Sequence, residues 1–547
     1  MGETEKTDAT PAEEVDKKTH FLHTLYTHTR LMAVLLVAMM YPLLCTIGGP
    51  WSIKHYVSIT LLNYLEACLL VVLLSLITNR RAYRIASRFV FAIVIIEGVL
   101  GLIGAALVHG SLDADVVAAF LATNPAEARE MAGTFLTPKI IGIFLGYPCA
   151  LLVTYRLCRN ATHHAPSKRV RLAMTGLLIV SVCISGYYQY VKAGITHHAT
   201  PTQMITLVTS CYEYAHCKKH HIIKTHPQLE VTQAGQPPIV VCIIGESTSR
   251  LHSSIYGYEK ATNPLLQKKV DAGEAVAFRK VKSAWTHTLE SFRLMMTTYS
   301  KQADKSVCWY ECTTLPEIAN EAGYHTYWLS NQSKRGLYDN EISQYAEFCD
   351  TSVYVGNKYV GGYRTTFDGE LIPILRSMLT KTTGKDFFFV HLMGCHANFA
   401  NRYPDHFDHF KESDYADKPS SWRENLATYD NAALYNDSVV SALMDLVSDR
   451  EAIVVYAPDH GLDMYQTRPD HCAHGIGGNA ESENVARDIP FVVYMSDLYR
   501  TNHPDVAKRI AKSVDRDFDT ENLLYLLMDL MQCDFPSHVA AQKSVIR

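Results

Sequence analysis

Up to about residue 195 the chain contains long apolar stretches with few charges, whereas the remainder mixes charged and polar residues throughout. A run of about 18–20 apolar residues is long enough to cross the hydrocarbon core of a bilayer as a helix. We therefore predict five transmembrane helices followed by a large domain in water. The predicted spans are Leu31–Trp51, Tyr56–Ile77, Phe89–Val108, Ile140–Leu157 and Leu172–Tyr190.

The loops between these spans differ in charge. Those after the second and fourth spans are rich in arginine and lysine, whereas the loop after the third span is acidic. Because basic loops stay in the cytoplasm, the N-terminus is predicted to be cytoplasmic, and five crossings place the C-terminal domain outside. The first apolar run is too long for a signal peptide and lacks a small-residue cleavage site.

Length and charge limit the remaining possibilities. A chain of 547 residues is too long for one typical domain, and its net charge of -4 does not suggest a nucleic-acid binder. We predict a cytoplasmic tail (residues 1–28), a transmembrane domain (29–191), a bridging segment (192–235) and a soluble domain (236–547). We expect a monomer. Nine of the 14 cysteines lie beyond the spans, where an oxidising compartment permits disulfides; Cys211/Cys217 and Cys308/Cys312 are candidate pairs.

Three apolar runs in the second half read as buried strands, and each ends on residues that bind metals or phosphates. They are 239–245 before Glu246, 387–390 before the segment 391–396, and 453–458 before Asp459 and His460. Ligand sites of open α/β sheets lie outside the carboxyl ends of the strands. The runs therefore predict a metal site, although Glu246 and Asp459 could instead begin helices.

Further strands are predicted at 324–329 and 490–495, with a strand-like run at 278–281. Helical spacing is found at 315–322, 429–446 and 521–531. This alternation indicates an α/β domain with a doubly wound sheet and helices on both faces.

Phosphate chemistry also requires a nucleophile. The segment 283–291 precedes an expected helix at 292–296, and a hydroxyl at a helix N-terminus benefits from the backbone N–H groups. Ser283, Thr286 and Thr288 are equivalent candidates by chemistry alone, and any of them could simply cap the helix. Imidazoles near the same sheet edge are contributed by four histidines, namely His391, His396, His471 and His474.

These motifs, in this order after five spans, resemble the phosphoethanolamine transferases of Gram-negative envelopes, which include the lipid A-modifying enzymes behind polymyxin resistance. The resemblance covers most of the chain. The motifs that carry it are Gly245-Glu246-Ser247, Thr262-Asn263-Pro264, the segment 283–291, Ser330-Asn331-Gln332, His391 to His396, Tyr429-Asp430-Asn431, Asp459-His460-Gly461 and His474-Gly475.

The resemblance implies an alkaline-phosphatase/sulfatase-like catalytic domain that binds one zinc ion tightly, with room for a second. It assigns the zinc ligands to Glu246, Thr286, Asp459 and His460, and it selects Thr286 as the nucleophile. It assigns the phosphate contacts to His396 and His474, either of which could be the general acid. The substrate contacts that it implies are Thr123, Glu127, Asn331, His396 and His474.

The resemblance further implies an enzyme of the bacterial inner membrane with a periplasmic catalytic domain. Phosphatidylethanolamine would donate the group, and lipid A or the core of lipopolysaccharide would accept it, through a covalent threonine intermediate. The chain departs from many members at Ala284, where they carry a disulfide-forming cysteine, and at Ala119 and Ser333.

Two other interpretations compete with this one. A glycerol-phosphate transferase of the lipoteichoic-acid synthase type shares the five spans and a threonine nucleophile, but favours manganese and lacks the Tyr429-Asp430-Asn431 and His474-Gly475 motifs. A membrane sensor with a decayed catalytic domain would have lost a ligand position, and none is lost. Two carboxylates within the spans, Glu66 and Glu97, either line a lipid path or form hydrogen bonds within the helix bundle.

Overall fold

The computed structural model contains two compact units. The first comprises residues 1–118 and 132–213, and the second comprises residues 119–131 and 214–547. The structure describes residues 31–47, 53–108, 137–157, 232–233, 238–302, 309–332, 341–355, 366–382, 384–467, 472–474, 480–534 and 544–547, together with isolated positions between 117 and 212.

The first unit is helical over the predicted spans that the structure describes. Its helices are Leu31–Cys45, α2 (Ile53–Ser75), α3 (Arg80–Val108) and α6 (Pro138–Leu157). Two segments, Arg81–Ala106 and Pro138–Leu157, are long and apolar enough to cross a membrane, and the helix Leu31–Cys45 is apolar but shorter. Most of the fifth predicted span lies outside the described residues, so the number of five spans remains a prediction.

Glu66 and Glu97, the two carboxylates within the predicted spans, are both buried. Glu97 accepts a hydrogen bond from the backbone N–H of Met204, at 3.1 and 3.2 Å from its two oxygens. A carboxylate in an apolar bundle is stabilised by such a donor. For Glu97, the structure therefore supports a hydrogen bond within the unit.

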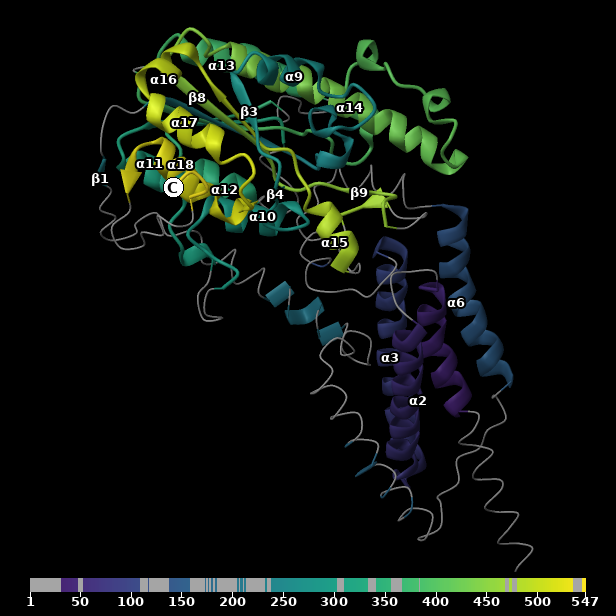
Figure 1. Ribbon diagram of the computed structural model, residues 1–547. Coiled ribbons are helices and arrows are strands. Elements are labelled where there is room, and N and C mark those ends of the chain that lie inside the picture. Colours follow the sequence, from purple (N-terminus) through teal and green to yellow (C-terminus); the bar gives the residue numbers. More distant parts are fainter. Residues whose placement is uncertain are drawn as a thin grey trace, which may run out of the picture. The chain divides into compact units, whose positions relative to one another are not determined.

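A seven-stranded sheet forms the centre of the second unit (Figure 1). Neighbouring strands run parallel except for β11, which is antiparallel to both β3 and β8. In spatial order the strands are β3 (Ala275–Ala277), β11 (Val492–Met495), β8 (Ala452–Pro458), β2 (Ile239–Gly245), β7 (Asp386–His391), β5 (His325–Ser330) and β6 (Thr351–Tyr354).

Helices cover both faces of this sheet (Figure 1). One face, with Val241, Phe388 and Val454, packs against α9 (Pro264–Asp271), α13 (Leu371–Leu379) and α14 (Ser420–Asp445). The other face is covered by α10 (Thr288–Met296), α11 (Leu315–Glu321), α12 (Glu341–Glu347) and α18 (Leu523–Leu530). The described remainder includes α15 (Ala480–Ala486), α16 (Asp497–Asn502) and α17 (Pro504–Lys512), and three strand pairs, namely β1 (Thr232–Gln233) with β13 (Cys533–Asp534), β4 (Val281–Lys282) with β12 (Phe518–Asp519), and β9 (Asp463–Met464) with β10 (Cys472–Ala473).

The sequence predicted the central sheet well. The five main predicted strands correspond to β2, β5, β7, β8 and β11, and their apolar residues are buried as expected. The strand-like run at 278–281 is wrong, because β3 ends at Ala277 and β4 begins only at Val281. Helix α14 begins at Ser420 rather than at the predicted Tyr429. Its first turns are largely polar and exposed, which obscures the apolar periodicity.

Gly394, in the loop after β7, packs directly on the backbone of Glu246. Its φ is +51°, and a Cβ atom there would lie 2.6 Å from the Glu246 carbonyl oxygen and 2.8 Å from its nitrogen. Only glycine fits both this conformation and this contact. Gly394 therefore allows the loop after β7 to pack against the end of β2.

We predict that Gly394→Ala destabilises the second unit more than Gly257→Ala. Gly257 also has a positive φ, of +97°, but nothing lies within 4 Å of its hypothetical Cβ atom. Gly257→Ala should therefore lose only the stability that a left-handed backbone costs, roughly 1–2 kcal/mol. Gly394→Ala should lose more, because its Cβ atom also clashes with the backbone of Glu246. Thermal unfolding of the two purified variants measures the difference, and equal losses would contradict the proposed contact.

Candidate active site

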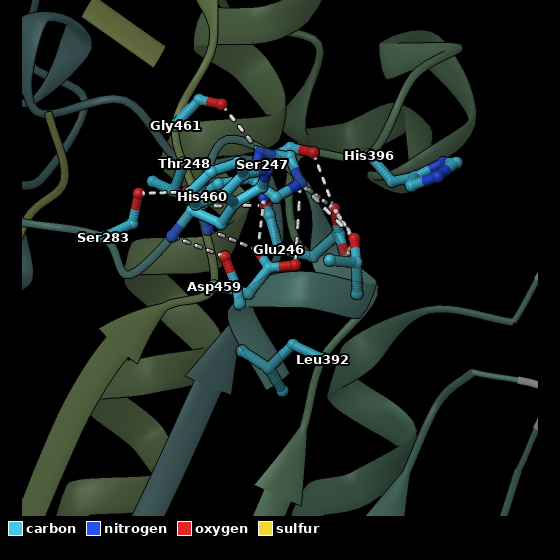
Figure 2. A network of polar contacts seen from close by, with 12 residues as sticks. Glu246, Ser247, Thr248, Ser283, Leu392, His396, Asp459, His460 and Gly461 are labelled. Carbon is cyan, nitrogen blue, oxygen red and sulfur yellow. Dashed lines mark hydrogen bonds and ion pairs between the residues drawn. The ribbon is translucent and has the colours of Figure 1, made fainter. Parts of the chain in front are cut away.

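Three metal-binding side chains meet at the carboxyl ends of β2 and β8. The two strands pair in parallel with Gly245 opposite Pro458, so Glu246 and Asp459 leave the sheet side by side. His460 follows directly. One ligand atom from each of Glu246, Asp459 and His460 lies within 4.8 Å of the others, and all three side chains are buried. Figure 2 shows them pointing toward one another.

Asp459 is anchored through one of its two oxygens. Its Oδ1 accepts the backbone N–H groups of His460 at 2.7 Å and Ser247 at 3.2 Å. Its Oδ2 is buried and accepts no hydrogen bond from any described residue. It lies 3.5 Å from Nε2 of His460. A buried carboxylate oxygen without a donor is suited to bind a cation.

The ring of His460 is fixed by its own turn. Its Nδ1–H donates to the carbonyl of Gly461 at 2.7 Å, which directs Nε2 toward the carboxylates, 3.2 Å from Oε1 of Glu246. Metal-binding histidines are commonly oriented in this way. Gly461 itself packs against backbone, since a Cβ atom there would lie 2.9 Å from the carbonyl oxygen of Asp488. The glycine of the Asp-His-Gly motif thus allows the turn that aims the imidazole.

Both oxygens of Glu246 also have donors. The hydroxyl of Ser247 donates to Oε1 at 2.7 Å, and the side-chain amide of Gln332 donates to Oε2 at 3.3 Å. Gln332 follows β5, so a third strand end contributes to the site. Sequence reasoning assigned no role to either residue, although both lie within the quoted motifs.

The charges of the cluster favour a bound cation. Burial and the neighbouring Glu246 raise the pKa of Asp459 to about 8. Burial alone would lower the pKa of His460, but the two carboxylates raise it to about 9. Without a metal, protons on Asp459 and His460 balance the charge of this buried cluster, and a bound cation can take their place. Carboxylate oxygens and an imidazole nitrogen are a donor set that suits zinc, so the residues fit this metal.

Of the three candidate nucleophiles, Thr288 has its hydroxyl at this cluster. Its Oγ1 lies 3.2 Å from Oε2 of Glu246 and 3.4 Å from Nε2 of His460. Thr288 is also the first residue of α10, after His287 as the cap. A hydroxyl in this position faces the positive end of the helix dipole, which stabilises negative charge on the oxygen.

The structure does not bring Thr286 or Ser283 to the cluster in this way. Thr286 makes no hydrogen bond to Glu246, Asp459 or His460, all of which are described, and Ser283 donates its hydroxyl to the carbonyl of Trp285 at 2.6 Å. Among the three candidate hydroxyls, the described contacts therefore bring that of Thr288 to the cluster, which differs from the expectation for Thr286. The three hydroxyls differ in their position relative to α10, which begins at Thr288 rather than at the predicted residue 292.

Two predicted histidines lie beside the cluster. The short strands β9 and β10 form an antiparallel pair, which brings the chain after β10 back toward the residues before β9. The ring centre of His474 therefore lies 4.6 Å from that of His460. Burial and His460 hold the pKa of His474 well below its usual value, so this ring is neutral. His396 lies to the side of the cluster (Figure 2), and its Nδ1 is buried without a hydrogen bond to a described residue.

Other predicted site residues have different surroundings. His391 is a core residue whose ring packs edge-on against Phe292 at 5.0 Å, and burial lowers its pKa to about 4. Asn331 is buried and donates to Asp368 at 2.8 Å, and Asp368 in turn accepts the backbone N–H of Gly394 at 2.9 Å. Asn331 therefore supports the loop that leads to His396. Thr123, Glu127 and His471 lie outside the described residues.

Comparison with known proteins agrees with this arrangement. The sulfatase family matches residues 238–533, which include the whole central sheet, and the chain belongs to this family. Within it, the chain is similar to phosphoethanolamine transferases, which confirms the resemblance seen in the motifs. It is 24% identical over 430 residues to the phosphoethanolamine transferase EptC of Escherichia coli K12, covering 75% of this chain and 73% of that protein. It is 28% identical over 265 residues to the Kdo(2)-lipid A phosphoethanolamine 7''-transferase of the same strain, covering 48% and 45%.

Two solved structures show the same fold. The C-terminal periplasmic domain of EptC from Escherichia coli, solved as a complex with zinc, has a TM-score of 0.53 and 25% identity, and the match covers 59% of this chain and 90% of that one. The integral membrane protein lipooligosaccharide phosphoethanolamine transferase A of Neisseria meningitidis has a TM-score of 0.66 and 18% identity, covering 95% and 97%. The second match shows that the fold extends over both units.

We predict that Asp459→Asn removes most of the zinc from the purified chain. The substitution preserves shape but removes the charge that a buried divalent cation requires. Metal analysis of the full-length protein after dialysis measures the stoichiometry. The matched control is Asp437→Asn, because Asp437 is equally buried and accepts two backbone N–H groups, both at 2.9 Å, at the start of α9. Equal zinc in both variants would contradict the assignment.

Proposed function

We propose that this protein transfers phosphoethanolamine from phosphatidylethanolamine to lipid A or to the core of lipopolysaccharide. The reaction proceeds through phosphoethanolamine bound to Thr288. The observation that carries the proposal is the position of the Thr288 hydroxyl, 3.2 Å from Glu246 and 3.4 Å from His460, at the start of α10. The names of the relatives supply the transferred group and the glycolipid acceptor.

In the first half of the reaction, Oγ1 of Thr288 attacks the phosphorus atom of the donor phosphodiester. The new bond joins Oγ1 to phosphorus, and the bond between phosphorus and the glycerol oxygen breaks. The proton of the Thr288 hydroxyl passes to a carboxylate oxygen of the cluster, and Oε2 of Glu246 lies 3.2 Å away. The glycerol oxygen takes up a proton and leaves as diacylglycerol.

Negative charge grows on the phosphoryl oxygens during this step and must be stabilised. Zinc held by Glu246, Asp459 and His460 would lower the pKa of the Thr288 hydroxyl and offset this charge. The neutral ring of His474 carries one N–H group that it can donate to a phosphoryl oxygen. His396 is the candidate to protonate the leaving oxygen, because a neutral imidazole such as that of His474 is not an acid near neutral pH.

In the second half, a hydroxyl or phosphate oxygen of the acceptor attacks the same phosphorus atom. The bond to Thr288 breaks, its oxygen regains a proton, and the enzyme returns to its starting state. Such a sequence gives ping-pong kinetics, because the first product leaves before the acceptor reacts.

The apolar helices of the first unit fit an enzyme whose donor and acceptor are both lipids. The charges of its loops favour a cytoplasmic N-terminus and a periplasmic catalytic domain in the inner membrane. We assign the enzyme one tightly bound zinc ion, with Nδ1 of His396 and of His474, which accept no hydrogen bond from a described residue, as candidate ligands of a second. Thr123 and Glu127, in the acidic loop, are assigned to the lipid substrate on the resemblance alone.

We predict that Thr288→Ala reduces transfer by at least about 10³-fold, as removal of a nucleophile does in other covalent enzymes. The assay uses full-length protein in detergent with labelled phosphatidylethanolamine and follows both the release of diacylglycerol and the mass of the protein. The native chain should acquire one phosphoethanolamine group on the peptide that contains residue 288.

The matched control is Thr286→Ala, which removes a buried hydroxyl two residues away. We expect this variant to keep the covalent group and most of the activity. Thr288→Ser should retain partial activity because it restores an oxygen at the same position. Loss of the covalent group in Thr286→Ala together with its retention in Thr288→Ala would overturn the assignment.

A further inference from the structure

The loop after Glu246 makes a strained turn that serves the candidate zinc site. Ser247 is fully buried and has a φ of +54°, a conformation that residues other than glycine rarely adopt. From this position its hydroxyl donates to Glu246 at 2.7 Å, and its backbone N–H donates to Asp459 at 3.2 Å. One residue therefore orients both carboxylates, and an extended backbone at Ser247 would redirect both donors.

The strain at Ser247 requires an opposing contact, because it costs of order 1–3 kcal/mol. The hydroxyl of Tyr429, on α14, provides that contact. It donates to the carbonyl of Ser247 at 2.8 Å and accepts the backbone N–H of Ser249 at 2.8 Å. The hydroxyl oxygen of Tyr429 is thus hydrogen-bonded to the backbone on both sides of residue 248.

Tyr429 is itself rigidly held. Its side chain is fully buried, and its ring packs edge-on against Phe399 at 5.0 Å and His252 at 5.2 Å. The next residue, Asp430, accepts hydrogen bonds from Tyr258 at 2.7 Å and from Tyr415, and pairs with His252 at 2.8 Å. These contacts fix the ring of Tyr429 and therefore the position of its hydroxyl.

We propose that Tyr429 is a positioning residue for the metal centre. Its hydroxyl holds Ser247 in the strained turn, and Ser247 in turn sets the distance and orientation of Glu246 and Asp459. Tyr429 touches none of the ligand side chains, so it acts through Ser247. This inference rests on the zinc site of the proposed function but not on the group that is transferred. It gives the Tyr429-Asp430-Asn431 motif a role beyond packing.

The test compares two tyrosine hydroxyls that make the same pair of bonds. The hydroxyl of Tyr256 also donates to a carbonyl, that of Phe491 at 3.1 Å, and accepts a backbone N–H, that of Phe491 at 3.0 Å. Neither of these bonds involves the loop at Ser247. Tyr429→Phe and Tyr256→Phe therefore remove equivalent hydrogen bonds, of which only one supports the metal centre.

The readout is the affinity of full-length protein in detergent for Zn²⁺, measured by competition with a chromophoric chelator, with thermal stability recorded alongside. We expect Tyr429→Phe to weaken zinc binding about 10–100-fold, as loss of an outer-sphere partner does. Tyr256→Phe should lower stability by a similar amount and leave zinc affinity unchanged. Equal zinc affinity in Tyr429→Phe and the native chain would overturn the proposal.

A double-mutant cycle with Ser247→Ala tests the route of the effect. This substitution deletes only the hydroxyl that donates to Glu246. If Tyr429 acts through Ser247, the double variant should lose less zinc affinity than the product of the two single losses. Independent, multiplicative losses would show that Tyr429 does not act through Ser247 and would overturn the proposal. A native chain that binds zinc but transfers no phosphoethanolamine would contradict the proposed function and leave this inference intact.

Discussion

Two carboxylates buried side by side at the end of a sheet are the constraint around which this site is built. Like charges about 4 Å apart repel by about 4 kcal/mol even at an effective dielectric constant of 20. The groups around Glu246 and Asp459 all present positive charge or hydrogen-bond donors to the carboxylates. They include an imidazole, two backbone N–H groups, a serine hydroxyl, an amide and the start of α10. A divalent cation completes this balance with the ligand atoms that the fold already provides.

The parallel sheet explains why these residues meet. Strands β2 and β8 are neighbours and β7 flanks β2 on the other side, so three chain segments far apart in sequence end at one edge. Each of these strands is fully buried, which makes its backbone a rigid support. The close packing also requires two glycines, Gly394 and Gly461, because a Cβ atom at either position would meet neighbouring backbone.

The sequence was sufficient to predict that Glu246, Asp459 and His460 meet, but not which hydroxyl lies beside them. Glu246, Asp459 and His460 follow long apolar strands, which are the most readily predicted elements. The choice between Thr286 and Thr288 depends on where α10 begins, and helix boundaries are uncertain by two or more residues when predicted from sequence. The contact between Tyr429 and Ser247 joins residues 182 positions apart, so no local pattern could have revealed it. Gln332 reaches Glu246 for the same reason, through the order of strands in the sheet.

The helix that carries Thr288 must also be held in place. Before it, Ala284 is buried and donates its backbone N–H to the Thr520 hydroxyl at 2.8 Å. On α10 itself, Arg293 forms a bidentate ion pair with Glu341 of α12, at 2.8 and 2.9 Å. Its guanidinium also lies 5.0 Å from the centre of the Trp309 ring. Because a mostly buried charge is stable only while its partner remains in position, this pair restricts rotation of α10 and keeps the hydroxyl of its first residue at the metal centre.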